Sequence, residues 1–356
     1  MKRRLKVLLG TSGLVLAVAL APIVTIETTC RAPIEGLETG GYKPLITDPK
    51  WQRDESRTWL TYPEWHIVYS AESFGRYLAE GKPPSGYHYV RDVRGFWSGY
   101  CAMNQAAAGR SDTDARVMLY TIGLSYSGEL LTKALYENTL GRIGEWVGGS
   151  NSADDRYAAQ VQQRYGAFMH ERPWYEFPFG LALSGLWATK GSGFRHWERR
   201  LALSGEYGVK TGYAKLIGWA SGASLGRDER ALQLVVRGNG KALAAVDPRF
   251  HLVGPAGKGL TLVEAPRYEE FTELLLKLAK TPIELVEISG NDDVYLTVLM
   301  PPGDAVPGPG VHLLTTQIDD PAGWRRLGIS TKVPDLLRLM NLTRQYGGRV
   351  EHVYDY

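Results

Sequence analysis

The pattern of apolar and polar residues divides the chain into three parts. Residues 7–26 are an uninterrupted apolar run, residues 58–230 show mostly helical spacing, and the rest alternates short apolar runs with amphipathic stretches. Helical spacing predicts helices that pack through one face, whereas short apolar runs between turn residues predict strands. The sequence therefore predicts an α+β protein with an N-terminal transmembrane helix. The predicted segments are a basic tail and signal-anchor at 1–30, a linker at 31–57, a helix-rich domain at 58–230 and an α+β domain at 231–356.

The apolar run from Val7 to Ile26 predicts a membrane anchor. At a helical rise of about 1.5 Å per residue it spans about 30 Å, the thickness of a bilayer core. Four cations within the first six residues precede the run. The positive-inside rule therefore keeps the N-terminus in the cytoplasm and places the body across the membrane. Cleavage after Ala21 is the alternative, although Pro22 is a poor residue to follow a cleavage site. We expect an uncleaved single-pass anchor.

The net charge of +3 raises the question of nucleic-acid binding. Four of the 41 cations precede the apolar run, so the rest of the chain carries 37 cations against 38 anions, a net charge of −1. The basic residues thus indicate membrane topology, and we expect no nucleic-acid partner.

Two helix starts carry side-chain capping signals. Thr61 is a candidate N-cap, with Pro63 in the first turn and Glu64 completing a capping box. Ser152 and Asp155 have the same spacing, with the shorter aspartate in place of glutamate.

The C-terminal part predicts a ferredoxin-like α+β domain. Gly290–Asp293 has the composition of a hairpin turn between two of its strands. The order of strands and helices resembles the split βαβ pattern, a scaffold that supports many functions. We find no internal sequence repeat. The predicted strands cover 232–236, 260–263, 283–288, 294–299, 311–317 and 350–354, and the predicted helices 268–280 and 333–346.

An aromatic stripe with a histidine is the first candidate site. Trp59, Tyr62, His66 and Tyr69 recur at helical spacing, with Trp65 beside them. Such a stripe could line a binding pocket in which His66 is an acid or base near a helix start. The alternative is that the aromatic residues pack in the core and the histidine makes a core hydrogen bond.

Acidic residues among aromatic ones form the second candidate site. Trp174 and Tyr175 precede Glu176, and Glu198 and Glu206 follow downstream. Aromatic faces with paired carboxylates are the equipment of a glycan-processing site, and a buried acid among aromatics would have a raised pKa. The alternative is a network of arginine–glutamate ion pairs that ties helices together.

Other chemistry is sparse. The seven histidines form no HExxH motif, the two cysteines exclude a four-cysteine zinc site, and neither a P-loop nor GxGxxG is present. We therefore expect neither a metal nor a cofactor. Cys30 and Cys101 are either free thiols or a disulfide in an oxidising compartment.

Several specific strings of aromatic and charged residues lie between about residues 55 and 225: TYPEWHIVY (61–69), LYENTLGR (135–142), PWYEF (173–177), HWERR (196–200) and EYGVK (206–210). They resemble strings of a family of bacterial, mainly proteobacterial, envelope and inner-membrane proteins. The resemblance implies a bacterial protein with an N-terminal membrane segment. That family has no assigned activity, so the resemblance implies no catalytic role.

These features predict a single-pass bacterial inner-membrane protein, anchored through Val7–Ile26, with its body in the periplasm. We expect the body to bind a partner protein or an envelope ligand without catalysis. The alternative is an envelope hydrolase or transferase that acts on glycan or lipid, with the three glutamates and the histidine named above as acid–base residues.

Overall fold

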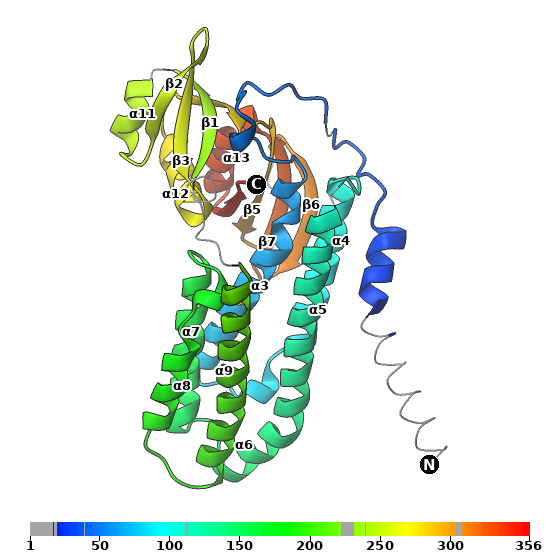
Figure 1. Ribbon diagram of the computed structural model, residues 1–356, viewed down its shortest axis with the longest axis vertical. Coiled ribbons are helices and arrows are strands. Elements are labelled where there is room, and N and C mark those ends of the chain that lie inside the picture. Colours follow the sequence, from blue (N-terminus) through cyan, green and yellow to red (C-terminus); the bar gives the residue numbers. More distant parts are fainter. Residues whose placement is uncertain are drawn as a thin grey trace.

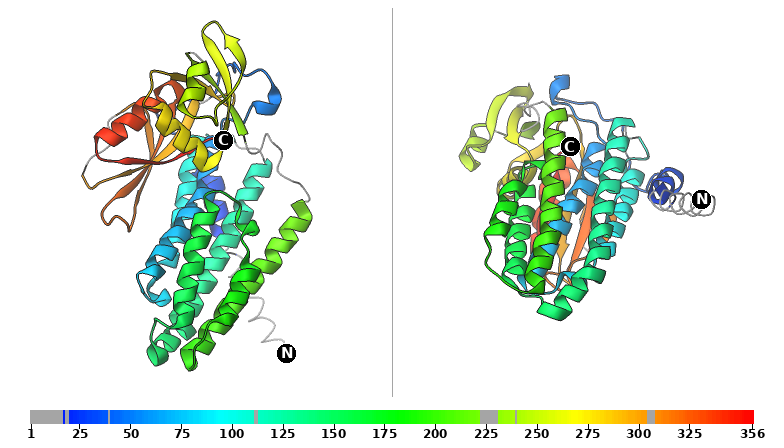
Figure 2. Two further views of the ribbon diagram at one scale, coloured as in Figure 1. Left: turned by 90° about the vertical axis from the view of Figure 1, so that its left-hand side faces the viewer. Right: turned by 60° about the horizontal axis from the view of Figure 1, so that its bottom comes forward.

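The computed structural model describes residues 17, 20–38, 40–110, 113–221, 231–238, 240–303 and 308–356. Long helices form an elongated bundle, and an α+β domain packs against one end of it (Figure 1). Figure 2 shows that the long helices run roughly along a common direction. The bundle contains α2 (Arg57–Leu60), α3 (Tyr62–Ala79), α4 (Tyr89–Ala106), α5 (Thr113–Tyr136), a π-helical turn (Glu137–Gly141), α6 (Arg142–Gly148), α7 (Ala153–Met169), α8 (Phe179–Ala188) and α9 (Phe194–Ser221). Single 3-10 turns lie at Pro49–Trp51, Pro84–Gly86 and Trp174–Glu176.

Two four-stranded antiparallel sheets form the C-terminal domain. The strands are β1 (Ala231–Arg237), β2 (His251–Gly257), β3 (Leu260–Pro266), β4 (Glu284–Ile288), β5 (Asp293–Met300), β6 (Val311–Gln317), β7 (Arg325–Lys332) and β8 (Arg349–Tyr354), and the helices are α11 (Gly240–Val246), α12 (Tyr268–Leu278) and α13 (Val333–Gln345). The first sheet has the order β2-β3-β1-β4 and the second β6-β7-β5-β8. The protein is therefore α+β, as predicted.

The two sheets repeat one unit. In each unit the first strand pairs on one side with the second strand of a hairpin and on the other side with the last strand. A helix directly follows the second strand of the hairpin. Both units also interrupt their pairing at matching places. The bulges lie at Val235/Val236 and Leu252/Gly254 in the first sheet and at Thr297/Val298 and His312/Leu314 in the second. The domain thus contains a structural duplication that the sequence pattern did not reveal.

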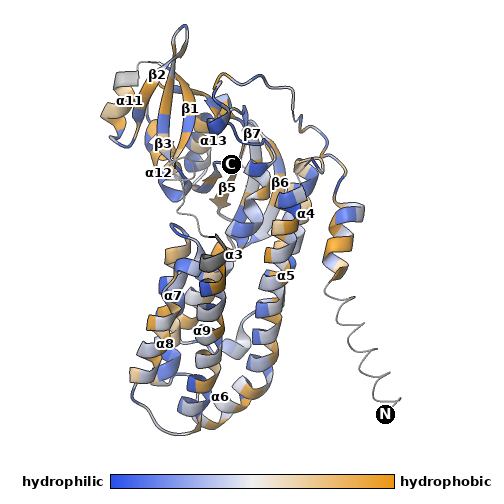
Figure 3. Ribbon diagram, viewed as in Figure 1, coloured by the Kyte–Doolittle hydropathy of each residue, from blue (hydrophilic) through white to orange (hydrophobic). Residues whose placement is uncertain are grey.

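One apolar core joins the two units. It takes residues from both sheets and from α12 and α13. Helix α13 contacts β4 and helix α12 contacts β8, so each helix packs against the last strand of the other unit. Figure 3 shows hydrophobic residues concentrated on the strands of this domain, whereas the bundle helices mix hydrophilic and hydrophobic residues along their length.

The second sheet is buried on both faces. All eight residues of β5 are buried. Leu296 and its neighbours on one face join the domain core, while Tyr295 on the other face packs against the bundle. The hydroxyl of Thr58 donates to the carbonyl oxygen of Tyr354 (2.8 Å) and accepts from the Tyr295 N–H (2.9 Å). These bonds join the start of the bundle to the sheet.

The predicted linker covers the edge of the first sheet. The backbone N–H groups of Leu45 and Ile46 donate to the carboxylate of Glu287 at 2.5 and 2.9 Å, and the Tyr42 hydroxyl donates to it at 2.8 Å. Glu287 is fully buried. These three donors satisfy the buried carboxylate. The linker is therefore bound to the C-terminal domain before the chain enters the bundle.

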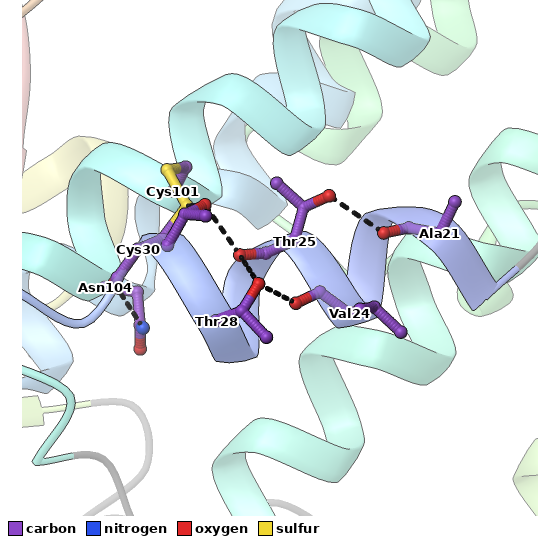
Figure 4. Close-up of a disulfide and its surroundings, with 8 residues drawn as sticks. Ala21, Val24, Thr25, Thr28, Cys30, Cys101 and Asn104 are labelled. Atoms are coloured by element: carbon purple, nitrogen blue, oxygen red, sulfur yellow. Dashed lines mark hydrogen bonds between the residues drawn. A yellow bond between two sulfur atoms is a disulfide. The ribbon is translucent and has the colours of Figure 1, made fainter.

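A disulfide fastens the N-terminal segment to the bundle. Residues 20–29 are helical, and Cys30 at their end is bonded to Cys101 of α4 (Figure 4). The Asn104 side chain donates to the Cys30 carbonyl oxygen (2.7 Å), and the Tyr120 hydroxyl of α5 donates to Glu27 (2.6 Å). The open question about the two cysteines is thus decided in favour of a bond.

Most of the predicted anchor, Val7–Ile26, lies outside the described residues. Within the part of the chain that is described, no helix combines the length and apolar character needed to cross a bilayer.

Of three local predictions, one is confirmed and two are wrong. Ser152 and Asp155 form the predicted reciprocal capping box at the start of α7. Thr61 is not an N-cap, because it has helical backbone angles and its hydroxyl bonds back to the Arg57 carbonyl oxygen. The turn at Gly290–Asp293 does not join a hairpin, since β4 pairs with β1 and β5 pairs with β7 and β8 in the other sheet. The sequence pattern also missed β2, β7 and α11.

Candidate functional site

The bundle contains a cavity of about 410 Å³ between α3, α5, α7 and α9, which opens to the surface beside exposed residues of α7 such as Gln160 and Gln163. This volume lies within the range of roughly 300–1,000 Å³ that small-molecule sites occupy. Apolar side chains line one part of the wall, among them Phe74, Leu78 and Leu203. The rest of the wall carries charged side chains from α5, the π-helical turn and α9, and their pairing decides what the cavity can do.

Glu206 of α9 is held between two lysines. Its carboxylate is 2.9 Å from the ammonium group of Lys133 and 3.3 Å from that of Lys210, which also bonds to Glu129 at 2.8 Å. Burial alone would raise the pKa of Glu206, but the two ammonium groups outweigh burial and lower it to about 2. This carboxylate therefore stays ionised and cannot act as a general acid near neutral pH.

Arg199 is the centre of a second buried network. Its guanidinium is almost completely buried and donates to both carboxylate oxygens of Glu137, at 2.9 and 3.0 Å, and to Glu198 at 2.6 Å. Burial raises the pKa of Glu137 and the charge of Arg199 opposes that rise. A bidentate pair of this kind fixes the geometry of the cavity wall.

Small residues make this close packing possible. The π-helical turn at Glu137–Gly141 adds a residue to one turn and places Glu137 inside the bundle. A Cβ atom at Gly144 would lie 2.7 Å from a carboxylate oxygen of Glu198. Glycine at this position therefore lets α6 approach the buried ion pairs of α9.

A further layer of ion pairs closes the tip of the bundle. Arg195 bonds to Asp155 at 2.7 Å and to Glu198 at 3.0 Å. His196 Nδ1 lies 2.5 Å from a carboxylate oxygen of Asp154. Glu198 thus has Arg195 and Arg199 as partners and is not a free acid.

His66 lies away from these acids. It is buried in α3, and its Nε2 atom bonds to the carbonyl oxygen of Asp92 at 2.9 Å. The Asp92 carboxylate accepts from the hydroxyls of Ser70 and Tyr87, both at 2.6 Å. Burial lowers the pKa of His66, so the neutral imidazole is favoured. This arrangement fits the core histidine of the sequence-based alternative.

The aromatic stripe forms an interface between the bundle and the second sheet. Trp59 donates to the Ser330 hydroxyl at 3.1 Å, and Trp65 stacks on His352 with ring centroids 3.6 Å apart. The Tyr69 hydroxyl lies 3.1 Å from that of Tyr354, and the Arg326 guanidinium lies 3.8 Å from the Tyr69 ring centroid. Trp59, Tyr62, Trp65 and Tyr69 are all buried and belong to one core cluster.

The second aromatic group lies on the flank of the bundle. Trp174 is half-buried and packs against Tyr213 with ring centroids 5.3 Å apart. Tyr175 is half-buried beside it. The carboxylate of Glu176 is partly exposed and lies 3.9 Å from Arg172. Of the four predicted acid–base residues, Glu206 lines the cavity, whereas His66, Glu176 and Glu198 lie elsewhere.

Several residues that line the cavity were not predicted, including Lys133, Glu137 and Arg199. A signal for them exists in the sequence. Arg195, Glu198 and Arg199 follow a helical spacing, so their side chains lie on one side of α9. Nothing in that spacing says whether the charged side faces water or the interior.

No group of three or more histidine, cysteine, aspartate or glutamate side chains is placed to hold a metal ion within the described ranges. Comparisons with family models, with curated proteins and with solved structures found no significant match for the chain. The resemblance to envelope proteins therefore stays a prediction, and a functional proposal depends on the geometry.

Proposed function

We propose that the protein is a single-pass inner-membrane protein whose periplasmic body binds an envelope ligand, or a partner protein, without turning it over. The observation that carries this proposal is the bundle cavity with its paired charges. Glu137, Glu206 and Asp155 line it, and each has a lysine or arginine partner. A preformed recess with fixed charges can orient a ligand but offers no free acid or base.

The disulfide supports the proposed compartment. Cys30 follows the apolar run Val7–Ile26 after three residues, and its bond to Cys101 is of the kind that persists in oxidising compartments such as the periplasm. The positive flank before the run favours the same topology.

The composition of the wall indicates an amphipathic ligand without net charge. Lys133 and Arg199 balance Glu206 and Glu137, while Phe74 and its apolar neighbours offer a surface to a hydrocarbon group. The buried ion pairs argue against the hydrolase alternative, because no carboxylate in the cavity is both buried and unpaired.

The C-terminal domain would then serve as the scaffold. We propose that each of its two units is a ferredoxin-like unit, on the basis of the strand order and the helix between the third and fourth strands. The second unit supports α3 through its outer face, and α3 forms one wall of the cavity.

Filling the cavity tests the ligand proposal. Ala159 of α7 lines the cavity, whereas Ala167 of the same helix is exposed outside it. Ala159→Leu should reduce the amount of small molecule that co-purifies with the full chain from solubilised membranes, as measured by native mass spectrometry. Ala167→Leu is the matched control and should leave that amount unchanged.

Equal ligand content in both variants would contradict the cavity as the site. A chain that alkaline carbonate extracts from the membranes would contradict the anchor instead. The two parts of the proposal therefore fail separately.

A further inference from the structure

We infer that the outer surface of α5, α6, α8 and α9 lies in contact with the apolar layer of the bilayer, so that the bundle is inserted from the side into the membrane that carries its anchor. This inference rests on the proposed anchor and adds the surroundings of the bundle to it. We call this the apolar surface and define it by the exposed residues Leu135, Trp146, Leu181, Trp197, Leu201 and Val209.

Over residues 194–213, helix α9 has its charged residues inside and its apolar residues outside, and the next charged residue, Lys215, is exposed. Between residues 194 and 213 the exposed positions are Phe, Trp, Leu, Gly, Val and Tyr, and none is charged. Arg199 and Lys210, by contrast, are buried within ion pairs. In water this arrangement is unfavourable, because the charges lose hydration and apolar side chains are exposed. Next to lipid it is favourable, because apolar side chains contact hydrocarbon and the charges stay paired inside.

Helices α5 and α6 continue the same surface. Leu135 is 69% exposed and Trp146 is 87% exposed, which is unusual for large apolar side chains outside a binding surface. Two exposed charged residues lie on these helices after Asp114. Glu129 of α5 is bonded to Lys210, and Arg142, the first residue of α6, bonds to the Asn138 side chain. The hydroxyls of Thr121 and of several other exposed residues bond to carbonyl oxygens one turn earlier, as suits surroundings without water.

The surface is continuous through packed neighbours. Helix α6 follows α5 through the π-helical turn and packs against α9, and α9 packs against α8. Helix α7 differs: its exposed residues include Arg156, Gln160, Gln163 and Arg164. The bundle therefore has an apolar side and a polar side, as a protein at a water–lipid boundary requires.

The described helix of residues 20–29, which contains the end of the predicted anchor, lies beside this surface. The helix of residues 20–29 lies along the outside of the bundle next to α5, and its amino-terminal end points toward the end that carries α6 (Figures 1 and 2). Glu27 contacts Tyr120 of α5, and the disulfide at Cys30 fixes this placement. Leu135 and Trp146 come after Tyr120 along α5 and α6, so they lie on the side toward which the amino-terminal end of the 20–29 helix points (Figure 1).

A bilayer fits this surface better than a protein partner does. The apolar positions spread over four helices, and the exposed hydroxyls among them bond within their own helices instead of presenting donors to a protein partner. Tryptophans at exposed positions, among them Trp146 and Trp197, are the residues enriched at membrane–water interfaces.

Spin-label accessibility tests the inference. Both native cysteines are in the disulfide, so a single introduced cysteine is the only free thiol available for labelling. The full chain is reconstituted into phosphatidylethanolamine–phosphatidylglycerol vesicles with labels at Val209→Cys and Leu135→Cys on the apolar surface. Arg164→Cys on α7 is the polar control, and Val15→Cys reports on the anchor. Molecular oxygen partitions into lipid, whereas a neutral nickel chelate stays in water.

We expect the ratio of oxygen to nickel accessibility at 209 and 135 to exceed that at 164 by about threefold or more. A water-like ratio at 209 and 135 with a lipid-like ratio at 15 would overturn the lipid contact while keeping the anchor. Protection of 209 and 135 from both reagents would show a protein cover and would also overturn it. A water-like ratio at 15 would contradict the anchor of the proposed function.

Native tryptophan fluorescence gives a second readout that needs no cysteine. Brominated lipids should quench the unsubstituted chain, and Trp146→Phe should remove part of that quenching. Quenching that is the same in Trp146→Phe and the unsubstituted chain would contradict lipid contact at the tip.

Discussion

Helices α9 and α12 place their charged and apolar residues on opposite sides relative to the interior. In α12 the buried positions are apolar, such as Leu274 and Leu278, and Glu270 and Glu273 face outward. In α9 the buried positions include Arg199, and the exposed positions from 194 to 213 carry no charge. The two helices belong to one chain with one overall composition, so the difference reflects what surrounds each half.

The comparison shows that amphipathic periodicity has no inherent direction. A helix buries whichever side its neighbours can satisfy, and charges can occupy the interior when each has a partner. The two interiors should therefore respond differently to substitution. The bundle should depend on matched charges, and the C-terminal domain on filled volume.

The largest expected effect is the loss of Arg199. Arg199→Met leaves Glu137 buried without its bidentate partner, and we expect a loss of about 3–5 kcal/mol in the free energy of unfolding. Leu274→Ala in α12 should lose about 2–5 kcal/mol through a cavity. Denaturant titration of the full chain in detergent measures both.

The double variant separates the two mechanisms. Glu137→Gln added to Arg199→Met removes the uncompensated charge and should restore most of the lost stability. A double variant as unstable as Arg199→Met would show that the guanidinium acts through volume, and the contrast between the halves would fail.

Removal of the disulfide should have a somewhat smaller effect. Cys30 and Cys101 are 71 residues apart, and chain entropy gives about 4 kcal/mol for a loop of this size, with engineered and native cases often lower. In the double serine variant, hydrogen exchange should quicken around α4 and in residues 20–29 while β5 stays protected. Equal loss of protection in β5 would show that the disulfide stabilises both halves together.

The capping box of α7 should contribute less again. Ser152→Ala removes an acceptor for the Asp155 N–H, and we expect a loss of about 1 kcal/mol. Ser152→Asn restores an acceptor and should recover most of that loss. Thr61→Ala should change the unfolding midpoint much less, because the Thr61 side chain makes no N-cap hydrogen bond to α3.

The smallest expected effect is a pH dependence of stability at the contact between the bundle and the C-terminal domain. His170, directly after α7, lies 3.7 Å from Glu72 of α3 and 3.5 Å from Glu269 of α12, and these carboxylates, Glu72 first, raise its pKa above the ordinary value. Trp65 and His352 also pack nearby.

The raised pKa means that the folded state binds the proton more tightly. The resulting stability is complete below the unfolded pKa of about 6.5 and disappears as the pH rises through the folded value. We expect less than about 1 kcal/mol, because the glutamates are partly exposed. His170→Gln should remove this pH dependence from the unfolding midpoint, and an unchanged dependence would assign it to other groups.

Much of the secondary structure could be predicted from the sequence. The helices at 268–280 and 333–346 correspond to α12 and α13, and the capping box at Ser152 is confirmed. These features depend on local spacing and local hydrogen bonds. The strands β2 and β7 escaped prediction, because glycine and charged residues interrupt their apolar pattern.

Long-range pairing could not be predicted in the same way. Gly290–Asp293 has the composition of a hairpin turn, yet the chain passes there from one sheet to the other. The candidate acid–base residues His66 and Glu198 are both buried. Arg195 and Arg199 pair with Glu198 locally, as the predicted arginine–glutamate alternative allows, whereas Asp92 is 26 residues from His66 and no pattern along the sequence pairs these two.

The duplicated unit has a consequence for how the chain reaches its native pairing. Both sheets have the same strand order and share two bulge positions, so we expect β7 to compete with β3 for pairing with β1 while the chain folds. Side chains that point away from the core shared by the two units distinguish one sheet from the other. Glu287 needs the N–H groups of the preceding linker, and Tyr295 fits only because Gly328 beside it has no side chain. A strand paired in the wrong sheet would leave the Glu287 carboxylate buried without donors or would collide with the Tyr295 ring. These two residues therefore disfavour wrong pairing between the two similar units of the C-terminal domain.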